Sequence, residues 1–453
     1  MVGGITPWII SVRDELLLFA TCGFVLGGLG DLAIDAIWLR RLLIQKLRPP
    51  ASMVRSLNDL PEPAIPPRIA VFVPAWREHA VISDMLSTAL NLWAGQNFQI
   101  FVGCYPNDPQ TMAVVLGLGA PEIRLVIAPH AGPTTKADCL NSIYAAMQSD
   151  EARRGMRFNA VLLHDAEDLV HADELALCRR LTNQYALIQM PVLPMQTRGS
   201  PWISGHYRDE FAEAHSRDLV VRGHIGASLP SAGVGCCLSR DALAALADQR
   251  GGHPFAHDSV TEDYELGLRL ADFGARAAFV RIGAASTRGL IATRAHFPGH
   301  LNAAIRQKAR WTLGIALDGW DRLGWRPNLV ENWMRLRDRR APLAAVIIVC
   351  GYSALLLTVL LMIVQPKTAF QVPSAGLFLI ITQYLLLWRL LIRSLCVRHH
   401  YGWMEGLLAI PRTLTSNVVA VLAARRAVSL YLHMRRTGKI TWEKTAHRSP
   451  LEP

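Results

Sequence analysis

The sequence lacks the spacing patterns that mark several common functional classes. Its eight cysteines are scattered, and none has the Cys-x-x-Cys spacing of a zinc site. We therefore expect them, including the vicinal pair Cys236-Cys237, to be reduced and mostly buried thiols. No Gly-x-Gly-x-x-Gly follows a strand-like run, and the glycines at positions 27, 28 and 30 lie inside an apolar segment. The sequence thus lacks the main signal of a dinucleotide-dependent oxidoreductase.

Long apolar runs, by contrast, are abundant at the two ends of the chain. Hydrophobic residues make up 51% of the 453 residues, and the mean hydropathy is +0.22. Leu16–Leu39, Ala341–Val364 and Ser374–Ile392 are nearly unbroken apolar segments, and each is close to the roughly 20 residues that cross a bilayer as a helix. The sequence therefore predicts three membrane-spanning helices.

A cleavable signal peptide is the alternative for the first apolar run. It needs a basic flank before the run and small residues after it, whereas here Asp31 and Asp35 interrupt the end of the run and basic residues follow at positions 40, 41, 46 and 48. The positive-inside rule then places the residues from 40 to 340 in the cytoplasm.

Basic residues exceed acidic ones and give a formal net charge of +11. Much of the excess is arginine next to the apolar segments, such as Arg335, Arg337, Arg339 and Arg340 before the second one. Arginines in such positions favour anionic lipid headgroups and fix the topology. Membrane lipids are therefore the expected partner of these residues, and no nucleic-acid partner is required.

The middle of the chain has the pattern of an α/β domain. Residues 49–67 contain six prolines and are expected to form a stiff linker from the membrane to this domain. Short β-rich runs then alternate with helical stretches, at 69–73, 99–103, 124–128 and 160–163. This alternation predicts a mostly parallel sheet, in which ligands gather at the carboxyl ends of the strands.

The segment Met404–Ala424 follows the third apolar run and is polar in its middle. Because Arg425 and Arg426 come next, we expect a helix in the membrane interface, with a fourth span as the alternative. The chain is therefore expected to begin with an apolar helix and its basic flank (1–48), the linker (49–67) and the α/β domain (68–298). A helix with a connector (299–340), two spans (341–393) and an interfacial helix with a tail (394–453) follow.

Acidic residues follow three of the predicted strands. Glu78 and Asp108 come after the first and second, and Asp165, Glu167 and Asp168 come directly after the fourth. Clustered carboxylates repel one another unless a cation lies among them, and hard oxygen ligands select Mg²⁺ or Mn²⁺. The last three residues are therefore a candidate metal site at which a diphosphate could bind, with a solvated acidic loop as the alternative.

The tripeptide Thr261-Glu262-Asp263 opens a helix-like run that stops at Gly274. Thr261 suits a helix N-cap, and carboxylates are favoured at a helix start, so capping alone is one explanation. The functional interpretation makes Asp263 or Glu262 a general base that removes a proton from a hydroxyl group.

Two further segments have side chains suited to phosphates. Within a predicted amphipathic helix, a spacing of three and four residues puts Gln307, Arg310 and Trp311 on one face. An amide and a guanidinium beside an indole suit a diphosphate next to a sugar ring, whereas an interfacial helix with basic and Trp anchors is the alternative. Lys136 lies in a turn that opens another helix, from which its side chain could reach a phosphate.

In this order, the motifs resemble glycosyltransferase family 2, of the cellulose-synthase-like membrane type. The resemblance covers roughly residues 68–320. It implies a GT-A fold and inverting transfer of a hexose or N-acetylhexosamine from a UDP-sugar to a growing glycan, with Mg²⁺ or Mn²⁺ as cofactor. It also implies a multi-pass enzyme of the bacterial inner membrane, with a cytoplasmic catalytic domain, in exopolysaccharide synthesis or secretion.

The resemblance implies a role for each candidate residue. Asp165 and Glu167 stand at the Asp-x-Asp metal and diphosphate position, and because Glu replaces the usual second Asp, Asp168 is a candidate to share the ligation. Asp263 stands at the position of the base, with Glu262 beside it. Five further residues are implied to bind the donor, namely Glu78, Asp108, Lys136, Gln307 and Arg310. Trp311 is implied to bind the acceptor.

Three spans are few for a polysaccharide channel within one chain. We therefore expect export to need a second subunit, self-association or an outer-membrane partner. Because a fold does not fix a function, the rival hypothesis is a non-catalytic membrane receptor or secretion scaffold built on the same fold.

Overall fold

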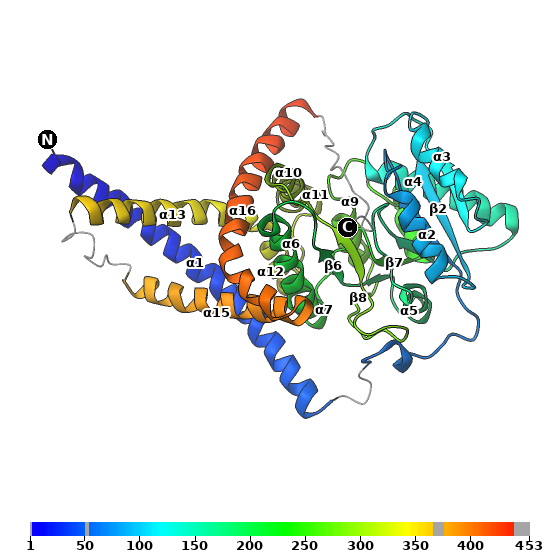
Figure 1. Ribbon diagram of the computed structural model, residues 1–453, viewed down its shortest axis with the longest axis horizontal. Coiled ribbons are helices and arrows are strands. Elements are labelled where there is room, and N and C mark those ends of the chain that lie inside the picture. Colours follow the sequence, from blue (N-terminus) through cyan, green and yellow to red (C-terminus); the bar gives the residue numbers. More distant parts are fainter. Residues whose placement is uncertain (1, 50–53, 366–375, 439–453) are drawn as a thin grey trace.

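The computed structural model describes residues 2–49, 54–365 and 376–438. An α/β domain lies at one end of the molecule, and a group of long helices extends from it at the other (Figure 1). The first two residues predicted for the third span, Ser374 and Ala375, lie outside the described residues.

A seven-stranded sheet of order β3-β2-β1-β4-β7-β5-β8 forms the centre of the domain. Its strands are β1 (Ile69–Pro74), β2 (Phe98–Cys104), β3 (Ile123–Ile127), β4 (Ala160–Leu163), β5 (Leu187–Gln189), β7 (Cys236–Ser239) and β8 (Ala277–Phe279). The first four pair in parallel, and β7 runs antiparallel to both of its neighbours. The predicted mostly parallel sheet and its four strands are thus confirmed. A separate pair, β6 (Val192–Met195) and β9 (Thr293–His296), is also parallel.

Both faces of the sheet are covered by helices, as a parallel sheet requires. Alternate residues of β1 belong to two different cores: Val71 and Val73 to one, and Phe72 to the other. The helices around the sheet are α2 (Ile82–Leu92), α3 (Pro109–Gly117), α4 (Lys136–Arg154), α5 (Glu174–Leu181), α8 (Arg240–Gln249) and α9 (Glu262–Asp272). Because β1 and β4 run in parallel, the loops that follow them lie at the same edge of the sheet.

Four helices in the described part of the chain are long and apolar enough to cross a membrane: α1 (Val2–Leu47), α13 (Ala341–Val364), α15 (Gly376–Tyr401) and α16 (Trp403–Thr437). Three of them contain the predicted spans. The fourth, α16, contains the expected interfacial segment and is longer than it. In Figure 1, α16 runs across the ends of α13 and α15, between them and the domain. Whether α16 lies in the interface or spans the membrane stays a prediction.

Shorter helices join the domain to the apolar ones. They are α6 (Pro201–Glu213), the π-helical segment η2 (Ala214–Asp218), α7 (Leu219–His224), α10 (Leu301–Thr312), the π-helical segment η3 (Leu313–Asp318), α11 (Gly319–Leu323) and α12 (Leu329–Arg339). Both α6 and α10 pack against α16. The donor- and acceptor-binding candidates on α10 are therefore carried by a helix that packs against the apolar helix α16.

The arginines before α13 form bonds within the protein, which the sequence did not predict, and their contact with lipid stays a prediction. Arg335 is fully buried, and its guanidinium bonds to Glu331 at 2.7 Å and to the carbonyl of Leu323 at 2.7 Å. Arg337 and Arg340 both form 2.9 Å ion pairs with Asp31 of α1. The net charge of the sequence could not reveal this, because the acidic partner lies some 300 residues away.

The predicted linker is bound to the domain in its described part. Ser56 caps the short 3₁₀ helix η1 (Leu57–Asp59), and the side chain of Leu57 is buried in a core of the domain. Ser56 also forms a β-bridge with Gly283. The second half of this segment is therefore part of the domain rather than a free spacer.

Candidate active site

A cavity of about 530 Å³ opens where β1 and β4 end. It collects side chains from the loops after both strands and from α4, α9 and α10. Ten of the eleven candidate residues line it, namely Glu78, Lys136, Asp165, Glu167, Asp168, Glu262, Asp263, Gln307, Arg310 and Trp311. The cavity thus lies at the carboxyl ends of the strands, the edge at which the sequence predicts a ligand to bind.

Lys136 forms the first ion pair of this cavity. A capping box between Thr135 and Asp138 starts α4, so that Lys136 is the first residue of the helix. Its Nζ lies 2.5 Å from Oδ1 of Asp165. Burial acts against its charge, but the carboxylate of Asp165 and two further carboxylates from α9 raise the pKa of Lys136 above its ordinary value. The lysine therefore stays charged and offers an ammonium group to an anionic ligand.

Asp168 is held by a buried histidine. Its Oδ2 is 2.9 Å from Nδ1 of His164 and accepts the backbone N–H of Asp165 at 3.0 Å. The other ring nitrogen of His164 is 2.9 Å from Glu174. No three His, Cys, Asp or Glu side chains come together as a metal cluster within the described ranges. A ready-made three-carboxylate site, as the sequence suggested, is therefore absent there, and Asp168 serves to shape the loop.

In the Thr-Glu-Asp motif, the threonine does not cap its helix. Thr261 stands at the N-cap position of α9 but makes no capping hydrogen bond, and its buried hydroxyl has no hydrogen-bond partner among the residues described. A Cβ on Gly314, in η3, would lie 2.5 Å from that hydroxyl. Close packing against η3 therefore fixes Thr261, and a side-chain cap does not explain this residue.

Glu262 and Asp263 form a carboxylate pair with raised pKa values. Burial and the charge of Asp263 raise the pKa of Glu262 to about 7. Burial also raises the pKa of Asp263, against the opposing charges of Lys136 and Arg310. Because the two groups interact, the titration belongs to the pair rather than to either residue. A carboxylate with a pKa near neutrality is suited to accept a proton.

Helix α10 presents the Gln-x-x-Arg-Trp face to the cavity. The Oε1 of Gln307 and the Nε of Arg310 are buried and have no hydrogen-bond partner in the part of the chain that the structure describes. Trp311 packs edge-on against Tyr207, with ring centroids 6.1 Å apart, and near Phe297 at 6.3 Å. This placement in an aromatic cluster beside the cavity differs from that of a lipid anchor, and it leaves an amide and a guanidinium ready for a ligand.

Asp108 is the one candidate that does not line the cavity. It is 4% exposed, and its carboxylate accepts the backbone N–H groups of Arg77 at 2.5 Å and Thr111 at 3.4 Å. Arg77 has a φ of +57°, which is unusual for a residue with a side chain. Asp108 thus holds the turn that carries Glu78 into the cavity, and its direct contact with a donor stays a prediction.

The sequence analysis missed several lining residues. Trp76 and Tyr105 follow β1 and β2, and their rings meet edge to face with centroids 5.2 Å apart. The strand-end rule that found the acidic residues could have found these two aromatic ones as well. Arg222, Asp338 and Ile34 also line the cavity. No local pattern marks them, because they reach it only through packing between the domain and the apolar helices.

Gly233 touches the candidate base and gives a direct test of its position. A Cβ there would lie 2.6 Å from Oδ2 of Asp263. We expect Gly233→Ala to lower the turnover roughly tenfold or more, because a small displacement of a catalytic group has a large effect on rate. The matched control is Gly226→Ala, at a similar positive φ (75° against 74°) but in open space. Equal turnover numbers for the two variants, measured at equal folded fraction, would contradict the assignment.

Comparison with known proteins agrees with this geometry. Residues 66–314 match the family described as "Glycosyltransferase like family 2". The chain therefore belongs to glycosyltransferase family 2.

Two curated relatives are similar over nearly the whole chain. They are Bacteriophage adsorption protein B of Escherichia coli K12 and Bacteriophage N4 adsorption protein B of Escherichia coli O157:H7, each 33% identical over 98% of this chain. The matched region is 63% of the length of these relatives. Among solved structures, a mannosyltransferase of Pyrobaculum calidifontis in complex with GDP-Man and Mn²⁺ has 15% identity and a TM-score of 0.54, and covers 93% of this chain and 99% of its own. That likeness shows the fold, which is the GT-A type with flanking apolar helices.

Proposed function

We propose that the protein is an inverting, metal-dependent glycosyltransferase that moves a hexose or N-acetylhexosamine from a UDP-sugar to a growing glycan. The observation that carries the proposal is the single cavity in which Lys136, the Glu262–Asp263 pair and Arg310 come together at the ends of the strands. The membership in glycosyltransferase family 2 supports it.

The donor diphosphate is assigned to the positive groups of the cavity. Lys136 and Arg310 provide an ammonium and a guanidinium, and Gln307 adds an amide. Mg²⁺ or Mn²⁺ fits the remaining donors, because such ions commonly bind one or two carboxylates and complete their shell with substrate phosphates. Asp165 and Glu167 would hold the ion, which neutralises charge on a diphosphate when bound. Asp168 is left to fix the loop through His164.

The transfer step follows from the carboxylate pair. Asp263 removes the proton of an acceptor hydroxyl, whose oxygen forms a bond to the anomeric carbon of the donor sugar. The bond from that carbon to the diphosphate oxygen breaks, and UDP departs with the bonding electrons toward Lys136 and Arg310. Trp311 offers an aromatic face to the acceptor ring. Attack opposite to the leaving group turns an α-linked donor into a β-linked product.

The proposed location is the bacterial inner membrane, with the catalytic domain in the cytoplasm. Helices α1, α13 and α15 would cross the bilayer, and α16 would lie along its cytoplasmic face, which agrees with its course across the ends of the other helices (Figure 1). Export of a glycan would then use self-association or an outer-membrane partner, in the synthesis or secretion of an exopolysaccharide.

Release of UDP tests the proposal directly. Purified full-length protein in lipid nanodiscs is incubated with Mn²⁺ or Mg²⁺ and a panel of UDP-hexoses and UDP-N-acetylhexosamines, with GDP-mannose for comparison. We expect UDP to be released from at least one donor and to require the metal. Release from no donor would refute the proposal.

A non-catalytic membrane component is the second candidate. The reason to test it is the name of the two relatives, which refers to phage adsorption. Such a component would bind no donor, or would bind one without turning it over. The same donor panel, read by calorimetry as well as by UDP release, separates the two functions.

A further inference from the structure

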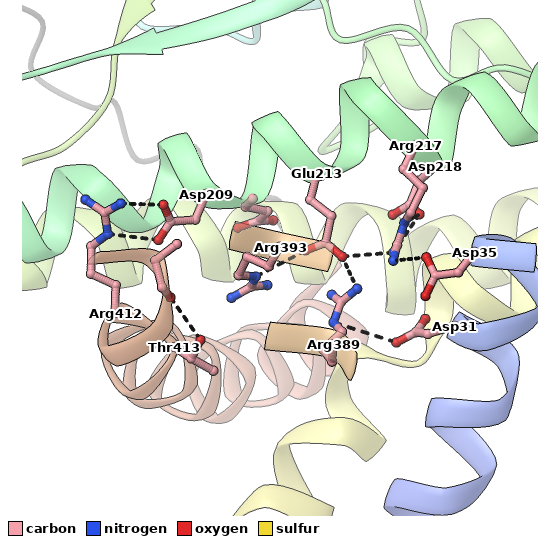
Figure 2. Close-up of polar contacts among 12 residues, drawn as sticks. Asp31, Asp35, Asp209, Glu213, Arg217, Asp218, Arg389, Arg393, Arg412 and Thr413 are labelled. Carbon is pink, nitrogen blue, oxygen red and sulfur yellow. Dashed lines mark hydrogen bonds and ion pairs between the residues drawn. The ribbon is translucent and has the colours of Figure 1, made fainter. Parts of the chain in front are cut away.

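One helical wall of the catalytic cavity has a second face that points toward the membrane helices. The wall is the uninterrupted helical run 201–224, which consists of α6, η2 and α7. Its cavity side is formed by Glu210, Phe211, Ala214, His215, Asp218, Leu219 and Arg222. On an adjacent stripe, at intervals of four residues, lie Asp209, Glu213 and Arg217. Figure 2 shows these three side chains facing charged residues of other helices.

Arg217 ties the wall to α1. It is fully buried, and its Nη1 lies 2.7 Å from Oδ1 of Asp35, which is 1% exposed. The second oxygen of Asp35 accepts the indole N–H of Trp388, from α15, at 2.8 Å. Asp35 therefore connects three segments that are far apart in the sequence: the wall, α1 and α15.

Two further links fix the same wall. Glu213 accepts hydrogen bonds from Arg389 and, at 3.1 Å, from Arg393, both on α15. One turn earlier, Arg412 of α16 binds Asp209 through two parallel bonds of 2.7 and 3.0 Å. The three links follow one another along the wall in Figure 2. Together they hold the wall against α1, α15 and α16.

Stability alone does not account for these ion pairs. Apolar residues of similar volume would hold the helices together equally well, because the desolvation of buried charges offsets most of their attraction. What charged groups provide is direction, since each bond is satisfied in one geometry only. A row of three such links fixes the rotation of the helical run about its own axis and its position along that axis, relative to α1, α15 and α16. The π-helical segment η2, which often marks functional sites, includes Arg217 on one face and His215 on the other.

The wall in turn supports the acceptor side of the site. Trp311, proposed to orient the acceptor, packs against Tyr207 and Phe211 of the wall, with ring centroids 6.1 Å away in each case. The groups assigned to the donor lie on the loops after β1 and β4, on α4 and on α10, outside the wall. Because the Trp311 ring packs directly on the wall, a shift of the wall would act first on the acceptor side.

We propose that Asp35, on the apolar helix α1, is a positioning residue for sugar transfer. Through Arg217 it fixes the helical wall that carries the acceptor side of the cavity, so that the membrane helices set the geometry of the transfer step. This inference rests on the proposed glycosyltransferase function. It adds a residue of α1 to those that govern the reaction.

The test is Asp35→Asn in full-length protein in lipid nanodiscs. The substitution keeps an oxygen for Trp388 and leaves Arg217 its ion pairs with Glu213 and Asp218, so the fold is expected to persist. We expect the rate of transfer to acceptor to fall roughly tenfold to a hundredfold, as for a displacement of about 1 Å. Binding of UDP, measured by calorimetry, should stay within about twofold, because the residues assigned to the donor lie on segments other than the wall. Hydrogen exchange of peptides from 201–224 should become faster, while β1 and β4 keep their protection.

Two further variants complete the design. Arg393→Gln loosens the link to α15 and leaves Glu213 its bonds to Arg389 and Arg217, so it should reproduce the effect of Asp35→Asn if that variant fails to fold. Asp14→Asn is the matched control, since it changes the same residue type on the same helix, and Asp14 pairs only locally with its neighbour Arg13 among the contacts described.

Three outcomes would overturn the inference: unchanged transfer in Asp35→Asn, an equal loss of UDP binding, or unchanged exchange of the wall. If wild-type protein turns over no donor, the proposed function fails on its own. The exchange experiment then still decides whether Asp35 holds the wall, because it needs no activity.

Discussion

Asp263→Asn is expected to lower the rate of transfer by about a thousandfold while UDP binding persists, because a positioned general base contributes on the order of 10² to 10⁴ in rate. An amide cannot accept the proton of the acceptor hydroxyl at neutral pH. Its shape nevertheless allows it to keep the bond from the backbone N–H of Tyr264, which Asp263 accepts at 2.7 Å. The measurement is the rate of product formation at saturating donor, with UDP affinity from calorimetry.

Two controls make this result specific. Asp272→Asn changes the same residue type at the other end of α9, outside the catalytic cavity, and should leave the rate within about twofold, as is usual for surface ion pairs. Glu262→Gln separates the two members of the pair. If Glu262→Gln abolished transfer and Asp263→Asn retained it, the base would be Glu262 instead.

The pH profile of the wild type provides a second readout of the same pair. A base must be deprotonated to act, and the carboxylate pair has raised pKa values, about 7 for Glu262. Activity should therefore rise with pH through neutrality rather than between pH 4 and 5. Substitution of Lys136 by Met would remove a positive charge that lowers both pKa values, so the rising limb should move to higher pH. A limb that stayed near the ordinary carboxylate range would contradict the assignment.

The sequence predicted the strand ends well because their chemistry is local. Each β-rich run and the acidic residue after it are adjacent in the chain, so the pattern alone places Asp165 and Glu78 at one edge of the sheet. Contacts between distant segments could not be predicted in this way. Nothing local shows that Thr261 packs on Gly314 instead of capping its helix, or that Thr293 donates a hydrogen bond to Glu174. The ion pairs of Arg337 and Arg340 were missed for the same reason, since their partner Asp31 lies on another helix.

Asp165→Asn should impair metal and donor binding together. Asp165 lies shortly after the end of β4, and its Oδ1 is 2.5 Å from Nζ of Lys136. An amide in its place would be a weaker oxygen ligand for a hard cation. Loss of several kcal/mol of charge stabilisation corresponds to a rate lower by roughly a hundredfold or more. The measurements are transfer rate against Mn²⁺ concentration, and Mn²⁺ binding in the presence of UDP by electron paramagnetic resonance.

The comparison of three variants shows which carboxylates hold the ion. Glu167→Gln should weaken Mn²⁺ binding as Asp165→Asn does, because both residues are assigned to the metal. Asp168→Asn should instead lower thermal stability, since it leaves the buried ring of His164 with one carboxylate fewer. Asp241→Asn, in an exposed pair with Arg157, is the surface control. Weaker Mn²⁺ binding in Asp168→Asn, with Glu167→Gln unaffected, would move the second ligand from Glu167 to Asp168. In that case His164 would orient a ligand of the metal as well as the loop.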